Sequence, residues 1–428
     1  MFLITKRTSI SVLAWFTAMF MFLPVNNAQA LSTGNIQSAP GELRQFIEII
    51  LPVHPRYVAA KAELGAARAL YDAADNAIYN PELELDAEKT DIQTATIGLS
   101  QTLDWGDQRG AKTQITKYRL DAAEAKLQRE RQQLIQDLLI SLNYYQNKTR
   151  LAELSIRRLK IMKDFYDVAQ KRYAAGDLSQ VELDLAQLAY SESIFKNAQI
   201  LSDQVRAEQD FYALYSLGSG ASSSSLPDLS FDFKNIKIPT GLDAFLLTLP
   251  QMRMLRANVD ASKYVIDLRQ GESIPDPTIA LRGGKEDEET LAGLTLTIPL
   301  NFRNPYRAEI EAARKEYLQA EQLAQQAYRN IRRDIKSLTR HYQLTFSAWR
   351  QWQTSGKVSV ERQLRFLKRL WQAGDLSTTD YLVQIKQNLD TQSAGIELDS
   401  TLWVSWLTWL EATAQIETWL QLKDTRTQ

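Results

Sequence analysis

Cysteine is absent from this chain, and histidine occurs only twice among its 428 residues. The lack of cysteine excludes a disulfide scaffold, thiolate metal sites, a cysteine nucleophile and the lipidated cysteine of a bacterial lipoprotein. His54 and His341 have no companion residues at metal-ligand or catalytic spacing, so structural roles are expected for both. The sequence therefore predicts neither an enzyme nor a bound cofactor or metal.

An excess of either charge is also lacking. The chain has 50 lysine and arginine residues against 51 aspartate and glutamate residues, a formal net charge of −1. Proteins that bind nucleic acids usually carry basic patches that neutralise phosphates. The charge balance therefore argues against a nucleic-acid partner.

Long hydrophobic runs are missing except at the N-terminus. Lys6 and Arg7 precede an apolar run at 10–23, and Ala28-Gln29-Ala30 follows it. This order of charge, apolar core and small residues is typical of a secretory signal, and the run is short against the roughly 20 residues of a membrane-spanning helix. We expect residues 1–30 to be a signal peptide, with a membrane anchor as the alternative, and no inner-membrane helix in 31–428.

Glycine and proline are scarce, so their positions are informative. Ala175-Gly176-Asp177-Leu178-Ser179 recurs as Ala373-Gly374-Asp375-Leu376-Ser377, and each copy lies between two long runs with hydrophobic residues three or four apart. This pattern predicts the tips of two long antiparallel helical hairpins, because glycine tolerates the positive φ of a tight reversal and serine can cap the returning helix. The expected helices span about 112–174, 178–217, 306–372 and 376–419.

Between the helices the hydrophobic period changes to two. In 82–88, leucines alternate with Glu82, Glu84, Asp86 and Glu88, and similar strands are expected at 94–103, 278–283 and 291–300, the last two joined by a charged loop at 285–289. Strands of about ten residues suit a tilted membrane-spanning strand. Four such strands cannot close a barrel, so the strands of several copies of the chain must together form one. A soluble sheet packed on helices is the alternative.

The two halves repeat each other at a displacement of 195 to 198 residues. Leu51-Pro52 recurs as Leu249-Pro250, and Asn80-Pro81 recurs as Asp276-Pro277. The expected organisation is repeat one at 41–217, an irregular linker at 218–241 and repeat two at 242–420. In each half two short helices stacked end to end would match the length of the long helix.

The chain has duplicated helical tips, duplicated helix-to-strand links at Asn80-Pro81 and Asp276-Pro277, and duplicated strand pairs, all in the same order. In this order it resembles the outer-membrane efflux proteins of the TolC family over nearly its whole mature length. The resemblance implies a mainly α fold with a small membrane β-barrel, in which a homotrimer forms a 12-stranded barrel in outer-membrane lipid and a helical barrel in the periplasm. It also implies a periplasmic adaptor and an inner-membrane pump, of the proton-driven RND type or the ATP-driven ABC type, as partners. The implied function is the exit duct of a tripartite efflux or type I secretion system.

The sequence also suggests a subgroup of the family and leaves an alternative function open. Trp105-Gly106-Asp107-Gln108-Arg109-Gly110 looks more like the CzcC-type heavy-metal subgroup than the drug-efflux members. A periplasmic adaptor or a structural coiled-coil protein of the cell envelope is the alternative to a channel.

By this resemblance the two tips dock the adaptor and close the periplasmic entrance. The implied docking residues are Ala175, Gly176, Asp177, Leu178 and Ser179 in the first tip, and Ala373, Gly374, Asp375, Leu376 and Ser377 in the second. The implied gate residues are Glu182, Trp371 and Asp380. Trp371 stands at the position of a family gate tyrosine and is expected to form an aromatic plug. Val383 and Leu376 replace an aspartate and an arginine of the family, so the entrance ring should be less negative and one family ion pair cannot form.

The remaining acidic and aromatic groups have two readings each. If the leucines of the first strand face lipid, Glu82, Glu84, Asp86 and Glu88 face the lumen. Arg282 offsets their negative charge only in part, so the sequence predicts a cation-preferring pore. The acidic stretch 286–289 is expected to be a solvated hairpin tip, with cation capture as the alternative. Trp403, Trp406 and Trp409 are expected to pack against the linker, with a ligand platform as the alternative.

Overall fold

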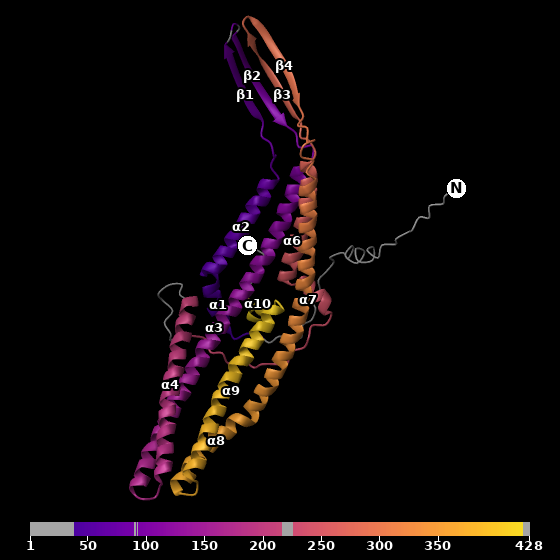
Figure 1. The fold of residues 1–428 in the computed structure, drawn as a ribbon. Helices are drawn as coiled ribbons and strands as arrows, with labels where there is room; N and C mark the ends of the chain where they lie inside the picture. Colours follow the sequence, from indigo (N-terminus) through magenta and orange to yellow (C-terminus); the bar gives the residue numbers. More distant parts are fainter. Residues whose placement is uncertain (1–37, 90, 92, 216–225, 423–428) are drawn as a thin grey trace, which may run out of the picture.

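The computed structural model describes residues 38–89, 91, 93–215 and 226–422. The expected signal peptide, the last two residues of repeat one and residues 218–225 of the expected linker lie outside this part of the chain. The described chain is elongated, with a small β-sheet at one end and two helical tips at the other (Figure 1). None of the helices within it is both long enough and apolar enough to cross a membrane.

The first half of the chain forms one long helix flanked by a row of shorter ones. Its elements are α1 (Gly41–Ile50), the 3₁₀ turn η3 (Leu51–Val53), α2 (Pro55–Ala74), α3 (Gln108–Ala174) and α4 (Gln180–Tyr215). α3 contacts both α2 and α4, and Figure 1 shows α2 and α4 one beyond the other along it. The prediction that two short helices lie along each long one is therefore confirmed for this half.

α3 begins four residues before its expected start because two aspartates cap it. The Asp104 carboxylate accepts hydrogen bonds from the backbone N–H groups of Gln108 and Arg109, at 2.9 and 2.8 Å. Asp107, in a left-handed conformation with φ of 50°, accepts from the N–H of Gly110. Acceptors at a helix start satisfy N–H groups that have no partner within the helix.

The second half has the same order but more interruptions. Its elements are α5 (Leu242–Thr248), α6 (Pro250–Glu272), α7 (Arg307–Gln351), the π-helical turn η5 (Trp352–Gly356), α8 (Lys357–Ala373), α9 (Thr378–Ala412) and α10 (Ile416–Leu420). Two expectations were wrong here: the long helix 306–372 contains a π-helical turn, and the return helix 376–419 breaks before α10, where Ala414 has a φ of 55°.

The side chain of Trp352 accounts for the π-helical turn. A Cβ placed on Gly356 would lie 2.1 Å from its indole ring, and a Cβ on Gly395 of α9 would lie 2.3 Å from it. The ring thus occupies the space left by two glycines, one in its own helix and one in the neighbouring helix. A π-helical turn widens the helix locally and lets this large side chain face α9.

Four antiparallel strands form one sheet in the order β1 (Glu82–Lys89), β2 (Gln93–Thr102), β3 (Thr278–Glu286) and β4 (Glu289–Thr297). The expected charged loop 285–289 was too long, because only Asp287 and Glu288 connect the last two strands. β4 ends at Thr297, before Pro299, which cannot donate a ladder hydrogen bond. β1 and β4 each have a strand partner on one side only among the described residues.

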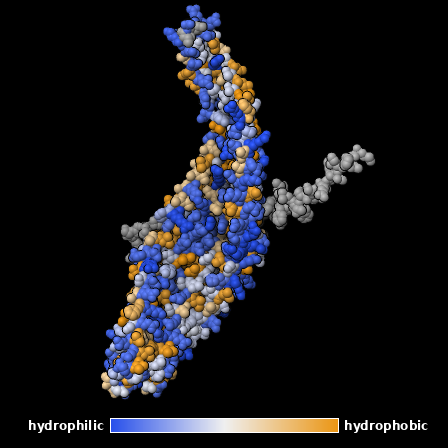
Figure 2. Space-filling model, viewed as in Figure 1, coloured by the Kyte–Doolittle hydropathy of each residue, from blue (hydrophilic) through white to orange (hydrophobic). Residues whose placement is uncertain are grey.

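The register separates an apolar face of the sheet from a polar one. Leu83, Leu99, Leu281 and Leu294 are in register across the four strands, and all four are exposed. Figure 2 shows hydrophobic residues at the surface of this sheet beside hydrophilic ones. The alternation predicted from the sequence is confirmed.

The main hydrophobic core lies at the middle of the molecule. It joins α1, α3, α4, α7, α9 and α10 with residues 226–236 of the linker. Trp403 donates a hydrogen bond from Nε1 to the Leu229 carbonyl oxygen at 3.1 Å and contacts Phe231 and Phe233. The expected packing against the linker is therefore confirmed for Trp403 and for Trp406, which stacks on Phe231. Trp409 instead donates to Thr339 of α7 at 3.1 Å.

Candidate functional site: the helical tips and the polar face of the sheet

The two tips have the same backbone geometry. Gly176 and Gly374 both have a φ of 82°, and the next residue in each copy donates a backbone hydrogen bond to a carbonyl five residues earlier: Asp177 to Arg172 at 2.8 Å and Asp375 to Leu370 at 3.0 Å. This is the Schellman arrangement that ends helices. A Cβ on either glycine would meet nothing within 4 Å, so the positive φ alone requires glycine.

Glu182 and Asp380, two of the expected gate residues, belong to reciprocal caps. The backbone N–H of Glu182 donates to Ser179 Oγ, while the Glu182 carboxylate accepts from the N–H and hydroxyl of Ser179 at 3.1 and 2.8 Å. In the second tip the N–H of Asp380 donates to Ser377 Oγ at 3.0 Å, and the Ser377 hydroxyl donates to the Asp380 carboxylate at 2.7 Å. Both serines therefore cap the returning helices, as predicted.

Hydrogen bonds from the Ser179 backbone and hydroxyl hold the pKa of Glu182 below its ordinary value, and the Thr378 hydroxyl and the charge of Arg172 act in the same direction. Thr378 belongs to the second tip. The low pKa of Glu182 therefore depends on groups of both tips.

Trp371 does not form the aromatic plug that the sequence suggested. Its side chain is 2% exposed and lies inside the tip, in a cluster built from α3, α4, α8 and α9. The indole stacks on Tyr381, with ring centres 4.7 Å apart and planes at 9°, and contacts Phe165 at 5.0 Å. Trp371 lies on the face of α8 that packs inside the tip, together with the buried Leu367. It therefore stabilises the shape of the second tip and does not line a pore.

Ion pairs that the sequence reasoning missed hold the two hairpins together. Arg158 of α3 donates to Asp390 of α9 at 2.7 Å, and Lys386 of α9 donates to Glu192 of α4 at 2.6 Å. Burial raises the pKa of Asp390, but the hydrogen bond and charge of Arg158, with Lys196 nearby, outweigh it and leave the pKa below its ordinary value. These pairs join residues more than 190 positions apart, so no local pattern could have revealed them.

An exposed apolar stripe also runs up α4 from the first tip. Val181, Leu188 and Phe195 are 76, 67 and 74% exposed and are seven residues apart. Side chains at this spacing lie on one face of a helix and form the seam of a coiled coil. On α8, Val358 and Phe366 are likewise more than half exposed.

The polar face of the sheet carries all five expected lumen residues. Glu82, Glu84, Asp86, Glu88 and Arg282 share it, as the register of the strands requires. Glu84 and Arg282 flank Gly98, and a Cβ on Gly293 would lie 2.9 Å from Arg282 Nε. Glu286 and Glu289 face the same way, in the row of Glu88. The sequence analysis missed these two because it assigned them to a loop.

The segment 105–110 has a structural role. A Cβ on Gly106 would lie 2.3 Å from the carbonyl oxygen of Gly271, and one on Gly110 would lie 2.5 Å from the Asp107 carboxylate. Close backbone packing and a helix cap thus explain the two glycines of this segment without reference to any cargo.

The described residues include no group of three or more His, Cys, Asp or Glu side chains that could hold a metal ion. His54 caps α2, where its Nδ1 accepts a hydrogen bond from the N–H of Arg56 at 3.2 Å. Burial lowers the pKa of His54, so its neutral form, the one that can accept this bond, is favoured.

Comparison with known proteins agrees with this architecture. Residues 47–217 and 242–415 match the family described as outer membrane efflux protein. None of the curated proteins compared matches the chain significantly.

Several solved structures share the fold. The open state of the MtrE outer membrane channel of Neisseria gonorrhoeae is 15% identical, with a TM-score of 0.74 over 92% of this chain and 93% of that one. The CmeC outer membrane channel of Campylobacter jejuni is 15% identical, with a TM-score of 0.73 over 93% and 92%. The outer membrane protein VceC of Vibrio cholerae is 16% identical, with a TM-score of 0.70 over 87% and 96%.

Proposed function

The chain belongs to the outer membrane efflux protein family, and we propose that three copies of it assemble into one exit duct that continues from the outer membrane into the periplasm. Family membership makes the protein an outer-membrane efflux channel and not an enzyme. It also decides against a periplasmic adaptor and a structural coiled-coil protein.

The open edges of the sheet carry the proposal of a trimer. The backbone groups on the outer edges of β1 and β4 have no partner strand among the described residues, although one face of the sheet is apolar enough for lipid. In lipid each unpaired backbone group costs several kcal/mol, so β4 of one copy must pair with β1 of the next. Three copies supply twelve strands, enough to close a barrel.

The exposed stripe on α4 supports the same assembly. α4 and α8 lie at opposite sides of the helical part, and both carry exposed apolar side chains. In a ring of three copies, α4 of one protomer would pack on α7 and α8 of its neighbour. Single exposed apolar residues need no explanation, but a stripe at heptad spacing indicates a partner helix.

Detergent-extracted protein is expected to run at three times the mass of the mature chain. Replacing both Leu188 and Phe195 with Asp should shift the protein toward monomers, because charges would then enter the apolar seam. Size-exclusion chromatography with light scattering measures this, and Gln187→Asp is the matched control, because Gln187 is exposed on the same helix but lies about 100° around it from Leu188. A stable wild-type monomer with intact β-structure would contradict the proposal.

The tips are the proposed dock for a periplasmic adaptor, which would connect the duct to an inner-membrane pump of the RND or ABC type. Their location at the end of the molecule farthest from the sheet supports this role (Figure 1). The reciprocal caps, with Glu182 and Asp380, give both tips a fixed shape for a partner to recognise. We further propose that the same tips narrow the periplasmic entrance.

The pore is expected to prefer cations. With the leucine face toward lipid, each copy turns six carboxylates and Arg282 to the lumen: Glu82, Glu84, Asp86, Glu88, Glu286 and Glu289. Rings of carboxylates raise the local concentration of cations. The reversal potential measured in a salt gradient should therefore lie close to the equilibrium potential of the cation.

Replacing Glu82, Glu84, Asp86 and Glu88 together with Gln or Asn should move the reversal potential toward zero. Lys89→Gln changes a charge on the opposite face of the same strand and serves as the control. Anion preference in the wild type would mean that the two faces of the sheet are assigned the wrong way round.

A further inference from the structure

The two short helices that lie along each long one meet end to end, and in the first half this joint is filled. His54, the N-cap of α2, packs near Leu214 at the end of α4, and the Tyr215 hydroxyl donates to the Leu138 carbonyl at 3.0 Å. Arg56, at the second position of α2, donates to Glu130, Gln133 and Asp137 of α3. Polar groups at this joint therefore satisfy one another.

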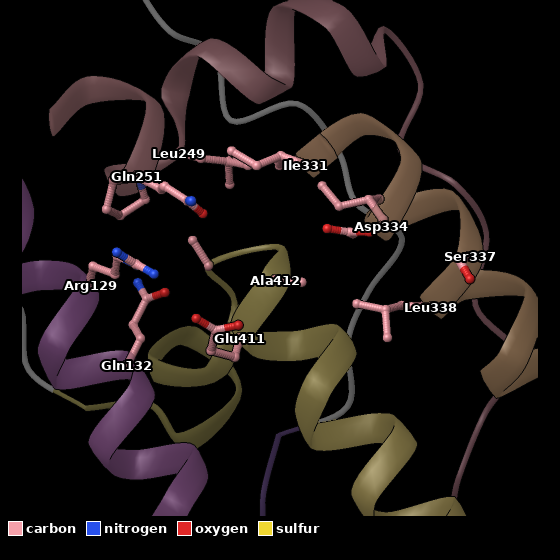
Figure 3. Close-up of a pocket in the computed structure, with 13 residues that line it drawn as sticks. Arg129, Gln132, Leu249, Gln251, Ile331, Asp334, Ser337, Leu338, Glu411 and Ala412 are labelled. Carbon is pink, nitrogen blue, oxygen red and sulfur yellow. The ribbon is translucent and has the colours of Figure 1, made fainter. Parts of the chain in front are cut away.

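The corresponding joint in the second half contains a pocket of about 300 Å³. It lies between the end of α9 and the start of α6, with α3 and α7 on its other sides (Figure 3). α6 also has proline at its first position, but its N-cap is Leu249, which cannot cap, and its second residue is Gln251 instead of an arginine. The residues that fill the first joint are therefore replaced here by smaller or apolar ones.

One side of the pocket carries hydrogen-bond donors. Arg129 and Gln132 of α3 and Gln251 of α6 extend into it (Figure 3). The Gln132 side chain is only 8% exposed, yet no hydrogen bond joins it to another residue that the structure describes. The N–H groups of Gln251 and Met252 at the start of α6 have no capping side chain. These donors reach the open space of the pocket, where a bound acceptor would receive their hydrogen bonds.

The other side of the pocket carries carboxylates. Glu411 of α9 lies at its base, and Asp334 of α7 lies opposite Arg129 (Figure 3). Oδ1 of Asp334 also accepts hydrogen bonds from Arg333 at 2.9 and 2.8 Å, so Glu411 is the main acceptor. Burial raises the pKa of Glu411, and the charge of Arg129 opposes this only in part, since no ion pair joins the two side chains. A cationic group beside Glu411 would offset the cost of its burial.

We propose that this pocket binds a small zwitterion of amino-acid size, with its carboxylate toward Arg129, Gln132 and the start of α6 and its ammonium group toward Glu411 and Asp334. The volume is at the lower end for ligand pockets and suits a molecule of amino-acid size. Leu249, Ile331 and Leu338 line the remainder and favour a branched apolar side chain. A simple anion would leave Glu411 unpaired, and a simple cation would leave Arg129 and Gln132 unpaired.

Isothermal titration of the purified full-length protein in detergent tests this with three matched probes. L-leucine carries both charges, isoamylamine lacks the carboxylate and 4-methylpentanoate lacks the ammonium group. L-leucine should bind about tenfold or more tightly than either, because each lost charge-assisted contact is worth roughly 1.5 to 3 kcal/mol. Binding is measured without transport, so the outcome is independent of the proposed export function.

Variants at the two ends of the pocket should separate the two contacts. Arg129→Gln should weaken L-leucine binding about tenfold and leave isoamylamine unchanged, whereas Glu411→Gln should weaken L-leucine and leave 4-methylpentanoate unchanged. Asp334→Asn, at a half-exposed position, provides a second acidic variant if Glu411→Gln does not fold. Arg340→Gln removes an exposed charge farther along α7 and is the control. Equal binding of the three probes, no binding of L-leucine at millimolar concentration, or unchanged affinity in both folded pocket variants would overturn the proposal.

Discussion

Gly176→Val and Gly374→Val are each expected to abolish export while leaving trimers in the outer membrane. Both glycines have a φ of 82°, a conformation that costs an L-residue roughly 1 to 2 kcal/mol and a β-branched residue more. Valine would therefore drive the reversal out of its Schellman geometry and displace the following serine cap. The sheet and the middle of the helices lie far from the tips, so the proposed trimer should assemble as before (Figure 1).

The measurement is retention of an efflux dye in cells that depend on this protein, together with the amount of trimer in outer-membrane fractions. Gly65→Val is the matched control, because Gly65 is exposed in α2, has an ordinary helical φ and has open space around its Cβ position. If both tip variants export normally with an unchanged adaptor interaction, the tips are only turns and the proposed dock must lie elsewhere.

Trp371→Ala is expected to raise the conductance of the pore. The substitution removes a side chain that is 2% exposed and packs on Phe165 and Tyr381, which should cost about 3 to 5 kcal/mol within the tip. The cost falls on the cluster that joins α8 and α9 to α3, so the second hairpin should loosen at the proposed entrance. Burial that raises the pKa of Tyr381 to about 12 is consistent with a dry cluster around this indole.

Single-channel recording in planar bilayers measures the effect. Trp371→Phe keeps an aromatic ring in the cluster and should change the conductance far less than Trp371→Ala. Equal conductance of the wild type and Trp371→Ala would mean that packing inside the tip does not hold the entrance narrow.

Trp371 also shows where reasoning from the sequence reached its limit. The sequence shows that Trp371 lies three residues before Gly374, and an aromatic residue at this position suggested a plug of the periplasmic entrance. Whether the ring points toward a pore or into the protomer depends on which face of α8 meets α3 and α9. The contacts with Phe165 and Tyr381 determine this orientation. Phe165 is more than 200 residues away from Trp371 along the chain, and Tyr381 is ten residues away.

Several site contacts were missed for related reasons. The pair of Arg158 and Asp390 joins two hairpins, and neither residue stands out in its own helix. Glu286 and Glu289 join the polar face of the sheet only because the connection between β3 and β4 has two residues instead of five. The pocket at the second joint arises from the meeting of four helices, so it has no signature in any one of them.

By itself the sequence determined the two hairpins, their glycine tips, the four strands and the two faces of the sheet. These features depend on local periodicity and on backbone conformations that only certain residues adopt, so they can be read from neighbouring positions. Tertiary structure alone decided the π-helical turn at Trp352, the inward position of Trp371, the break before α10 and the contrast between a filled and an open joint. Each of these results from side chains of distant segments competing for the same space, which no local pattern records.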